Sequence, residues 1–135
     1  MHGDSLEATA FGDVETGDLA HARKRFDAAR QLYGSDPANR MRIGRVDSEL
    51  AGIDLLEGQP ALARALLPDA IAGLRTRKYR IPPLLAEARL LLACTRSPGA
   101  QCPGDLQATI DHDLAAVASR GDPQLLWVHT LLAQV

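Results

Sequence analysis

Apolar residues recur every three or four positions through most of this chain of 135 residues. That spacing places them on one face of an α-helix, and Gly and Pro clusters separate the periodic segments. The pattern predicts no strand and seven helices, over residues 4–14, 19–33, 37–57, 60–78, 82–95, 105–120 and 123–133. We therefore expect an all-α fold built from antiparallel helical hairpins.

The segment 45–80 defines this architecture best. Two apolar runs flank Gly58-Gln59-Pro60. Gly suits the position just past a helix end and Pro the first turn of the next helix, so the triplet predicts a tight turn between two helices. Pro68 lies inside the second run, where it removes a backbone hydrogen bond. We expect a kink there, with a division into two helices as the alternative.

The length favours one domain over residues 1–135. Its hairpins are predicted over about 4–33, 37–78 and 82–120, followed by a terminal helix over 123–134. The first residues also fit a piece of a longer protein.

A repeat links the first two hairpins. Ala, a large apolar residue and Ala follow the turn glycines Gly17 and Gly58 at plus five, plus nine and plus twelve. They are Ala22, Phe26 and Ala29 in the first hairpin, and Ala63, Leu67 and Ala70 in the second. The two glycines give a period of about 41 residues, a length typical of repeat architectures. Thr109, Asp113 and Ala116 follow Gly104 at the same offsets, as a degenerate third copy.

This pattern resembles the tetratricopeptide repeat, over roughly residues 4 to 120. Leu50-Ala51 before the second turn and Asp36-Pro37 after the first hairpin also fit that family. The resemblance implies hairpins stacked as an α-solenoid with a concave groove. The departures are a period longer than the usual one, Asp54 in place of an aromatic residue, and the worn third unit. A plain helical bundle is the alternative.

The resemblance also implies where a partner would bind. One familiar mode in this family clamps a peptide carboxylate with Asn and Lys, but the only Asn is Asn39, in a turn, so that clamp is absent. The candidate groove residues on the first helices of the hairpins are Arg42, Arg45, Glu49 and Arg89, a set suited to acidic or phosphorylated segments. The alternative is that they only solvate the surface.

Composition and charge limit the other classes. Hydrophobic residues make up 46% and charged residues 24%, whereas aromatic residues make up only 4%, which favours helix over strand. No apolar run is long enough to span a membrane, and the N-terminus lacks the pattern of a secretory signal. The basic run 75–80 is typical of a helix end, and a single cluster with one aromatic residue, Tyr79, is not the aromatic-interleaved basic stripe of a nucleic-acid-binding surface.

The sequence indicates neither catalysis nor a metal. The four His residues and two Cys residues lack zinc spacing, and no phosphate-binding loop or nucleophile elbow occurs. We therefore expect no catalytic residue, no metal and no cofactor.

Cys94 and Cys102 flank a short loop and could form a disulfide. A disulfide would indicate an oxidising compartment such as a periplasm, whereas free thiols would fit the cytoplasm.

We expect a protein-interaction module, the regulatory part of a larger bacterial protein. The alternatives are a domain that senses a small molecule in a closed apolar pocket, or a structural dimerisation domain that pairs through its nearly all-round apolar last helix.

Overall fold

A computed structural model describes residues 3–75, 80–99 and 102–135. Within these ranges the chain forms seven α-helices and no strand, which confirms the predicted all-α class. The helices are α1 (Gly3–Glu15), α2 (Leu19–Tyr33), α3 (Arg40–Leu56), α4 (Pro60–Leu74), α5 (Ile81–Arg96), α6 (Leu106–Val117) and α7 (Gln124–Leu132). Two short 3₁₀ turns, η1 (Pro37–Asn39) and η2 (Ala118–Arg120), precede α3 and follow α6.

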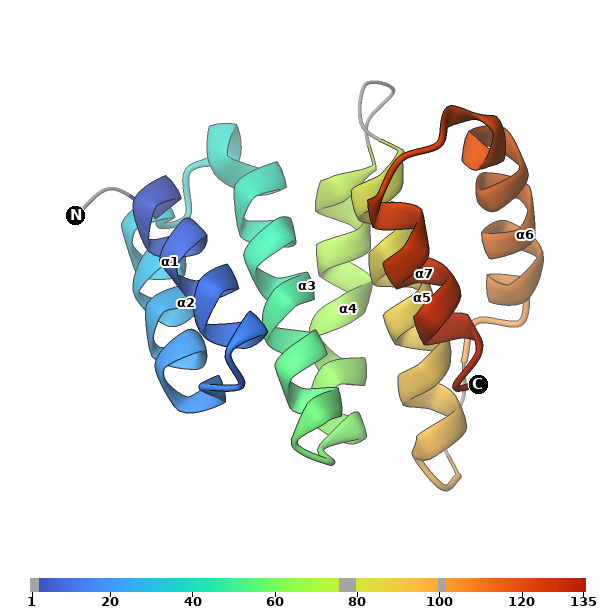
Figure 1. Ribbon diagram of the computed structural model, residues 1–135, viewed down its shortest axis with the longest axis horizontal. Coiled ribbons are helices and arrows are strands. Elements are labelled where there is room, and N and C mark those ends of the chain that lie inside the picture. Colours follow the sequence, from blue (N-terminus) through green and yellow to red (C-terminus); the bar gives the residue numbers. More distant parts are fainter. Residues whose placement is uncertain (1–2, 76–79, 100–101) are drawn as a thin grey trace.

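The helices lie largely side by side in chain order (Figure 1). α1 packs against α2, α2 against α3, α3 against α4 and α4 against α5. α5 contacts four helices, because α3, α6 and α7 also pack against it. α7 therefore returns to α5, and α3 lies between α1 and α7 in Figure 1.

The turns use the residues that the sequence places there. Gly17 and Gly58 have φ angles of 82° and 72°, in the left-handed region that Gly enters without steric cost. Pro60 begins α4, where its missing N–H would have no helical partner. The side chain of Asp18 accepts a hydrogen bond from the backbone N–H of His21 and caps α2.

Residues one repeat period apart have matching environments in the first two hairpins. All six repeat residues of α2 and α4 are buried, from Ala22 at 0% exposure to Ala70 at 1%. Close helix contacts recur with the same period: a Cβ on Gly3 would lie 2.7 Å from the Tyr33 ring, and one on Gly44 would lie 3.2 Å from Cγ of Leu74. The third copy differs, because Ala116 is exposed.

The second helix of the second hairpin is continuous, and its end differs from the expectation. α4 runs without a break from Pro60 to Leu74 with Pro68 inside it, so the alternative of two separate helices is wrong. The helix ends earlier than expected, with Arg75 as its C-terminal cap. Residues 76–78, the end of the expected helix, lie outside the described residues, as does residue 79 of the basic run.

The core has two parts that meet at α3. The smaller part joins α1, α2 and α3 around Phe26, whose ring makes an edge-to-face contact with Phe11 at a centroid distance of 5.5 Å. The larger part joins α3 to α7. Apolar residues of α3 contribute to both parts, so this helix connects the two parts of the core.

Candidate functional site

The predicted residue Arg45 of α3 is paired with α1. Its Nε and Nη2 each lie 2.7 Å from one carboxylate oxygen of Glu7, a bidentate geometry that is stronger than a single hydrogen bond. The Glu7 side chain is 4% exposed and that of Arg45 is 37% exposed. Tyr33 of α2 directs its hydroxyl to Glu7, with Oδ1 of Asp4 2.7 Å away. Burial, followed by these carboxylates, raises the pKa of Tyr33.

Arg89 of α5 and Glu49 of α3 form a second pair. Nη1 and Nη2 of Arg89 each lie 3.2 Å from an oxygen of Glu49, and the side chains are only 11% and 13% exposed. Nη1 also donates to the carbonyl oxygen of Ser48 at 3.0 Å and to its Oγ at 2.9 Å. Gly52 makes room for this guanidinium, because a Cβ there would lie 3.0 Å from Nε of Arg89.

Arg42 lies apart from the other three predicted residues. Its exposed side chain donates to Oδ1 of Asn39 at 2.9 Å, and its Cζ lies 5.9 Å from the centre of the Tyr33 ring. The structure therefore brings together Arg45, Glu49 and Arg89 and leaves Arg42 outside. The three grouped residues are engaged in contacts between helices, and their charges are largely balanced by Glu7 and by each other.

Two hollows lie over these pairs, lined mainly by α1, α3, α5 and α7. The larger hollow has a volume of about 140 Å³, and we call it the Leu56 pocket. Its apolar lining is Val14, Ile53, Leu55, Leu56, Leu92 and Leu131. Its polar lining is Glu49, Arg89, Arg96 and Gln134, with Gly52 between.

The smaller hollow, of about 80 Å³, is the Trp127 pocket. Phe11 and Trp127 line it together with Arg45 and Glu49. Glu49 lines both pockets, so they are adjacent, and we call them together the α3–α5 groove. Trp127 is 49% exposed, an unusual amount for so large an apolar side chain.

A third hollow, of about 430 Å³, lies among α2, η1, α3 and α4. Its lining is more polar and includes Arg30, Arg40 and Asp69. Nε of Arg30 lies 2.8 Å from Oδ1 of Asp47, which places another pair between helices at this hollow.

Asp54, which stands where the family resemblance expects an aromatic residue, is buried at 1% exposure. Its Oδ1 accepts a hydrogen bond of 2.6 Å from Nη2 of Arg23 on α2. The same Nη2 donates to Oε1 of Glu57 at 2.7 Å. An ion pair thus joins α2 to α3 at this position.

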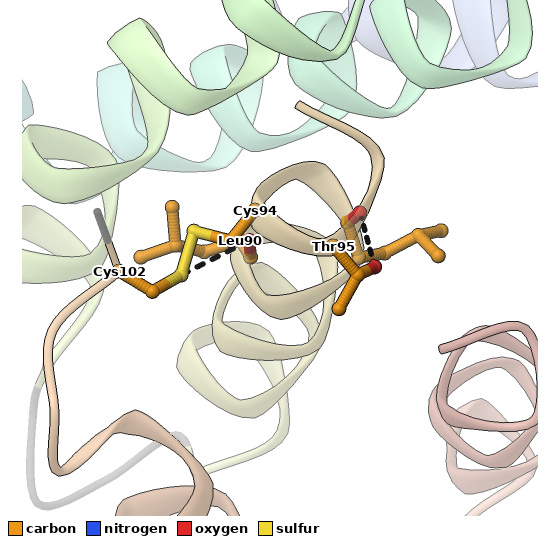
Figure 2. Close-up of a disulfide and its surroundings, with 5 residues drawn as sticks. Leu90, Cys94, Thr95 and Cys102 are labelled. Carbon is orange, nitrogen blue, oxygen red and sulfur yellow. Dashed lines mark hydrogen bonds between the residues drawn. A yellow bond between two sulfur atoms is a disulfide. The ribbon is translucent and has the colours of Figure 1, made fainter. Parts of the chain in front are cut away.

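Cys94 and Cys102 form a disulfide (Figure 2), with their Cα atoms 5.8 Å apart. The bond ties the last turn of α5 to the segment that leads into α6. Both cysteines are half-buried, and Cys102 lies beside the carbonyl oxygen of Leu90 in Figure 2.

Glu87 of α5 is a buried carboxyl group that the sequence does not reveal by any motif. It has 0% exposure, and its Oε1 accepts a hydrogen bond of 3.2 Å from Nη2 of Arg75. Its Oε2 has no hydrogen-bond partner in the described part of the chain. Burial, followed by the neighbouring carboxyl group of Asp113, raises the pKa of Glu87 to about 8.

Within residues 3–75, 80–99 and 102–135, no three His, Cys, Asp or Glu side chains gather in a way that could hold a metal ion. In the same ranges, none of the helices has the length and apolar character needed to cross a bilayer.

The fold and the groove define an all-α protein with an open, partly apolar groove on its surface. No protein-family model matches this chain, and neither a curated protein nor a solved structure matches it.

Proposed function

We propose that this chain is a protein-interaction module that binds a peptide segment of a partner protein in the α3–α5 groove. The observation that carries the proposal is the pair of adjacent open hollows, because pockets of about 140 and 80 Å³ suit single side chains of an extended peptide. Small-molecule sites are larger, at about 300–1,000 Å³.

The ion pairs around the groove support the same proposal. Arg45 and Arg89 are held by carboxylates of neighbouring helices, so the surface is already ordered before a ligand arrives. A preformed surface loses less conformational freedom on binding. The exposed Trp127 adds a large, rigid contact of the kind that often contributes most to binding.

The resemblance to tetratricopeptide repeats is consistent with this role. In our proposal the hairpins stack in the manner of that family, and α1, α3, α5 and α7 present the concave side. We further propose that the chain acts without a cofactor, as the regulatory part of a larger bacterial protein. The disulfide supports an oxidising compartment such as a periplasm.

The test is selection of a random peptide library on the whole chain, followed by fluorescence anisotropy with the enriched peptides. Leu56→Glu places a charge at the larger pocket and should weaken binding by about tenfold or more. Leu32→Glu is the matched control, because Leu32 and Leu56 both lie in the last turn of a helix and are 59% and 67% exposed.

Leu32→Glu should leave the affinity unchanged. Enriched peptides that bind both variants equally, or a library that yields no binder, would overturn the proposal.

A second candidate is the sensing of a small molecule in the hollow among α2, α3 and α4. Its volume of about 430 Å³ falls in the usual range for such sites, and Arg30, Arg40 and Asp69 offer charges of both signs. A metabolite that raises the melting temperature of the wild type but not of Arg40→Gln would favour this candidate. A particle mass twice that of the chain, lost in Leu126→Glu of α7, would instead favour dimerisation.

A further inference from the structure

The Leu56 pocket has one guanidinium at its rim whose charge no carboxylate of the described residues balances. Arg45 and Arg89 face Glu7 and Glu49 in the same groove. Arg96, in the last turn of α5, is exposed and donates from Nη2 to the amide oxygen of Gln134 at 3.1 Å. The Gln134 amide carries no charge, so the charge of Arg96 stays available to a ligand.

The helix geometry places this charge beside the apolar lining. Arg89, Leu92 and Arg96 follow one another at intervals of three and four residues, and all three line the pocket. Leu56, 67% exposed, and the half-buried Leu131 line it from α3 and α7. A ligand that fills the pocket therefore contacts apolar side chains and lies beside the exposed guanidinium of Arg96.

We propose that the Leu56 pocket takes an apolar side chain, that the residue two positions later in the peptide is Asp or Glu, and that Arg96 binds this side-chain carboxylate. The inference rests on the proposed function and adds the chemistry of the partner. A carboxylate can take the place of the Gln134 amide on the guanidinium and make charge-assisted hydrogen bonds. Arg45 and Arg89 remain with Glu7 and Glu49.

The geometry of an extended peptide sets the position of the acidic residue. In an extended peptide, successive side chains point to opposite sides. The side chain two positions from the pocket residue thus points to the same side as that residue, toward the rim of the pocket where Arg96 lies.

The experiment is an NMR titration of the isotope-labelled whole chain with three defined peptides. The first is a capped hexapeptide of glycine that carries leucine and, two positions later, glutamate. The second carries glutamine in place of glutamate. The third ends in leucine with a free carboxylate and carries no acidic side chain. Amide shifts locate each peptide, and their concentration dependence gives each Kd.

We expect the glutamate peptide to shift residues around the Leu56 pocket and to bind about fivefold more tightly than the glutamine peptide at low salt. The difference should shrink as salt is added, because an exposed charge pair is screened. It should disappear in Arg96→Gln and persist in Arg42→Gln, the control variant with an exposed Arg outside the groove.

Equal affinities for the glutamate and glutamine peptides would overturn the inference. So would a preference that survives in Arg96→Gln, or tighter binding of the free carboxylate. If library peptides still bind the groove and respond to Leu56→Glu, the proposed function stands while this inference fails. If no peptide binds the groove at all, the proposed function itself fails.

Discussion

Arg89 of α5 hydrogen-bonds Ser48 of α3, the residue that precedes it by one repeat period of 41 positions, through both the carbonyl oxygen and Oγ. One period before Ser48 stands Glu7 of α1, which accepts both hydrogen bonds from Arg45. The same repeat position in three successive hairpins therefore carries a buried polar residue. Hydrogen bonds of these residues connect α1 to α3 and α3 to α5. The charges predicted to serve a partner also hold the helices together.

Arg89→Ala should destabilise the fold. The change leaves the carboxylate of Glu49 without its counter-charge in a site that is only 13% exposed, and it removes the donor to Ser48. Loss of one partner from a largely buried pair costs about 3 kcal/mol. Urea unfolding followed by circular dichroism should show this loss in the free energy of unfolding.

Arg42→Ala is the control for that variant. Among the described residues its exposed guanidinium hydrogen-bonds only Asn39, the N-cap of α3, and it lies over the Tyr33 ring, so the cost should stay below about 0.5 kcal/mol. Equal losses in the two variants would show that the Arg89 pair has no special role in holding α3 against α5.

Two glycine-to-alanine changes should distinguish the effect of close helix packing on stability from the effect of helix propensity. Gly12 lies within α1, and outside the backbone of its own helix turn no other residue comes within 4 Å of the place that a Cβ would take, so Gly12→Ala should stabilise the chain by about 0.5–1 kcal/mol. A Cβ on Gly44 would lie 2.8 Å from the carbonyl oxygen of Ala70. Gly44→Ala should therefore push α3 and α4 apart and destabilise by about 1–3 kcal/mol.

Thermal unfolding of both glycine variants beside the wild type provides the measurement. A Gly44→Ala chain that melts at or above the temperature of Gly12→Ala would contradict the close packing of α3 on α4.

The helices could be predicted from sequence because their signals are local. The turn glycines Gly17 and Gly58 take the left-handed conformation that a helix end favours, and the apolar spacing around Phe26 marks its buried face. Pro68 inside α4 shows the limit of local rules, because packing keeps the helix continuous across it.

The buried charges could not be predicted, because a pattern of apolar and polar residues assigns charged residues to the surface. Glu7, Asp54 and Glu87 are nevertheless buried, at 3%, 1% and 0% exposure. Each lies in phase with an apolar stripe, for example Asp54 four residues after Leu50. Their position on the apolar face of a helix is the one feature of the sequence that indicates burial. Their Arg partners come from other helices, so no spacing within one helix identifies those partners.

Reduction of the Cys94–Cys102 disulfide should lower stability without unfolding the chain. The bond closes a short loop, with a sequence separation of 8, and the loss of loop-closure entropy is worth about 2.5 kcal/mol for such a loop. For a domain of this size the melting temperature should fall by about 10 °C on addition of a phosphine reductant. The Cys94→Ser/Cys102→Ser double variant should melt at the lower temperature with or without reductant.

A reductant that leaves the wild-type melting temperature unchanged would contradict a stabilising role for the bond. A double variant that still responds to the reductant would show that the effect arises elsewhere.

Glu87 should make the fold less stable as the pH rises. Its pKa is about 8 in the folded chain against an ordinary value of 4.5, so the folded state binds the proton more tightly than the unfolded state. The stabilisation from this proton is fully present below about pH 4.5 and is lost as the pH rises through about 8. Above that pH, Glu87 is charged in a buried site beside Asp113, with Arg75 as its only described partner.

Glu87→Gln keeps the shape of the side chain and removes this titration. Between about pH 5.5 and pH 8.5 the wild type should lose stability that Glu87→Gln keeps. The difference in the free energy of unfolding between the two chains should therefore change by on the order of 2 kcal/mol in favour of the variant over this range. Asp113→Asn should reduce the pH dependence of the wild type, because loss of the neighbouring carboxyl group lowers the pKa of Glu87. Urea unfolding at several pH values measures all three chains. Parallel pH profiles for the wild type and Glu87→Gln would mean that Glu87 titrates at its ordinary pKa, and that the interface of α5 with α6 is open enough to solvate its charge.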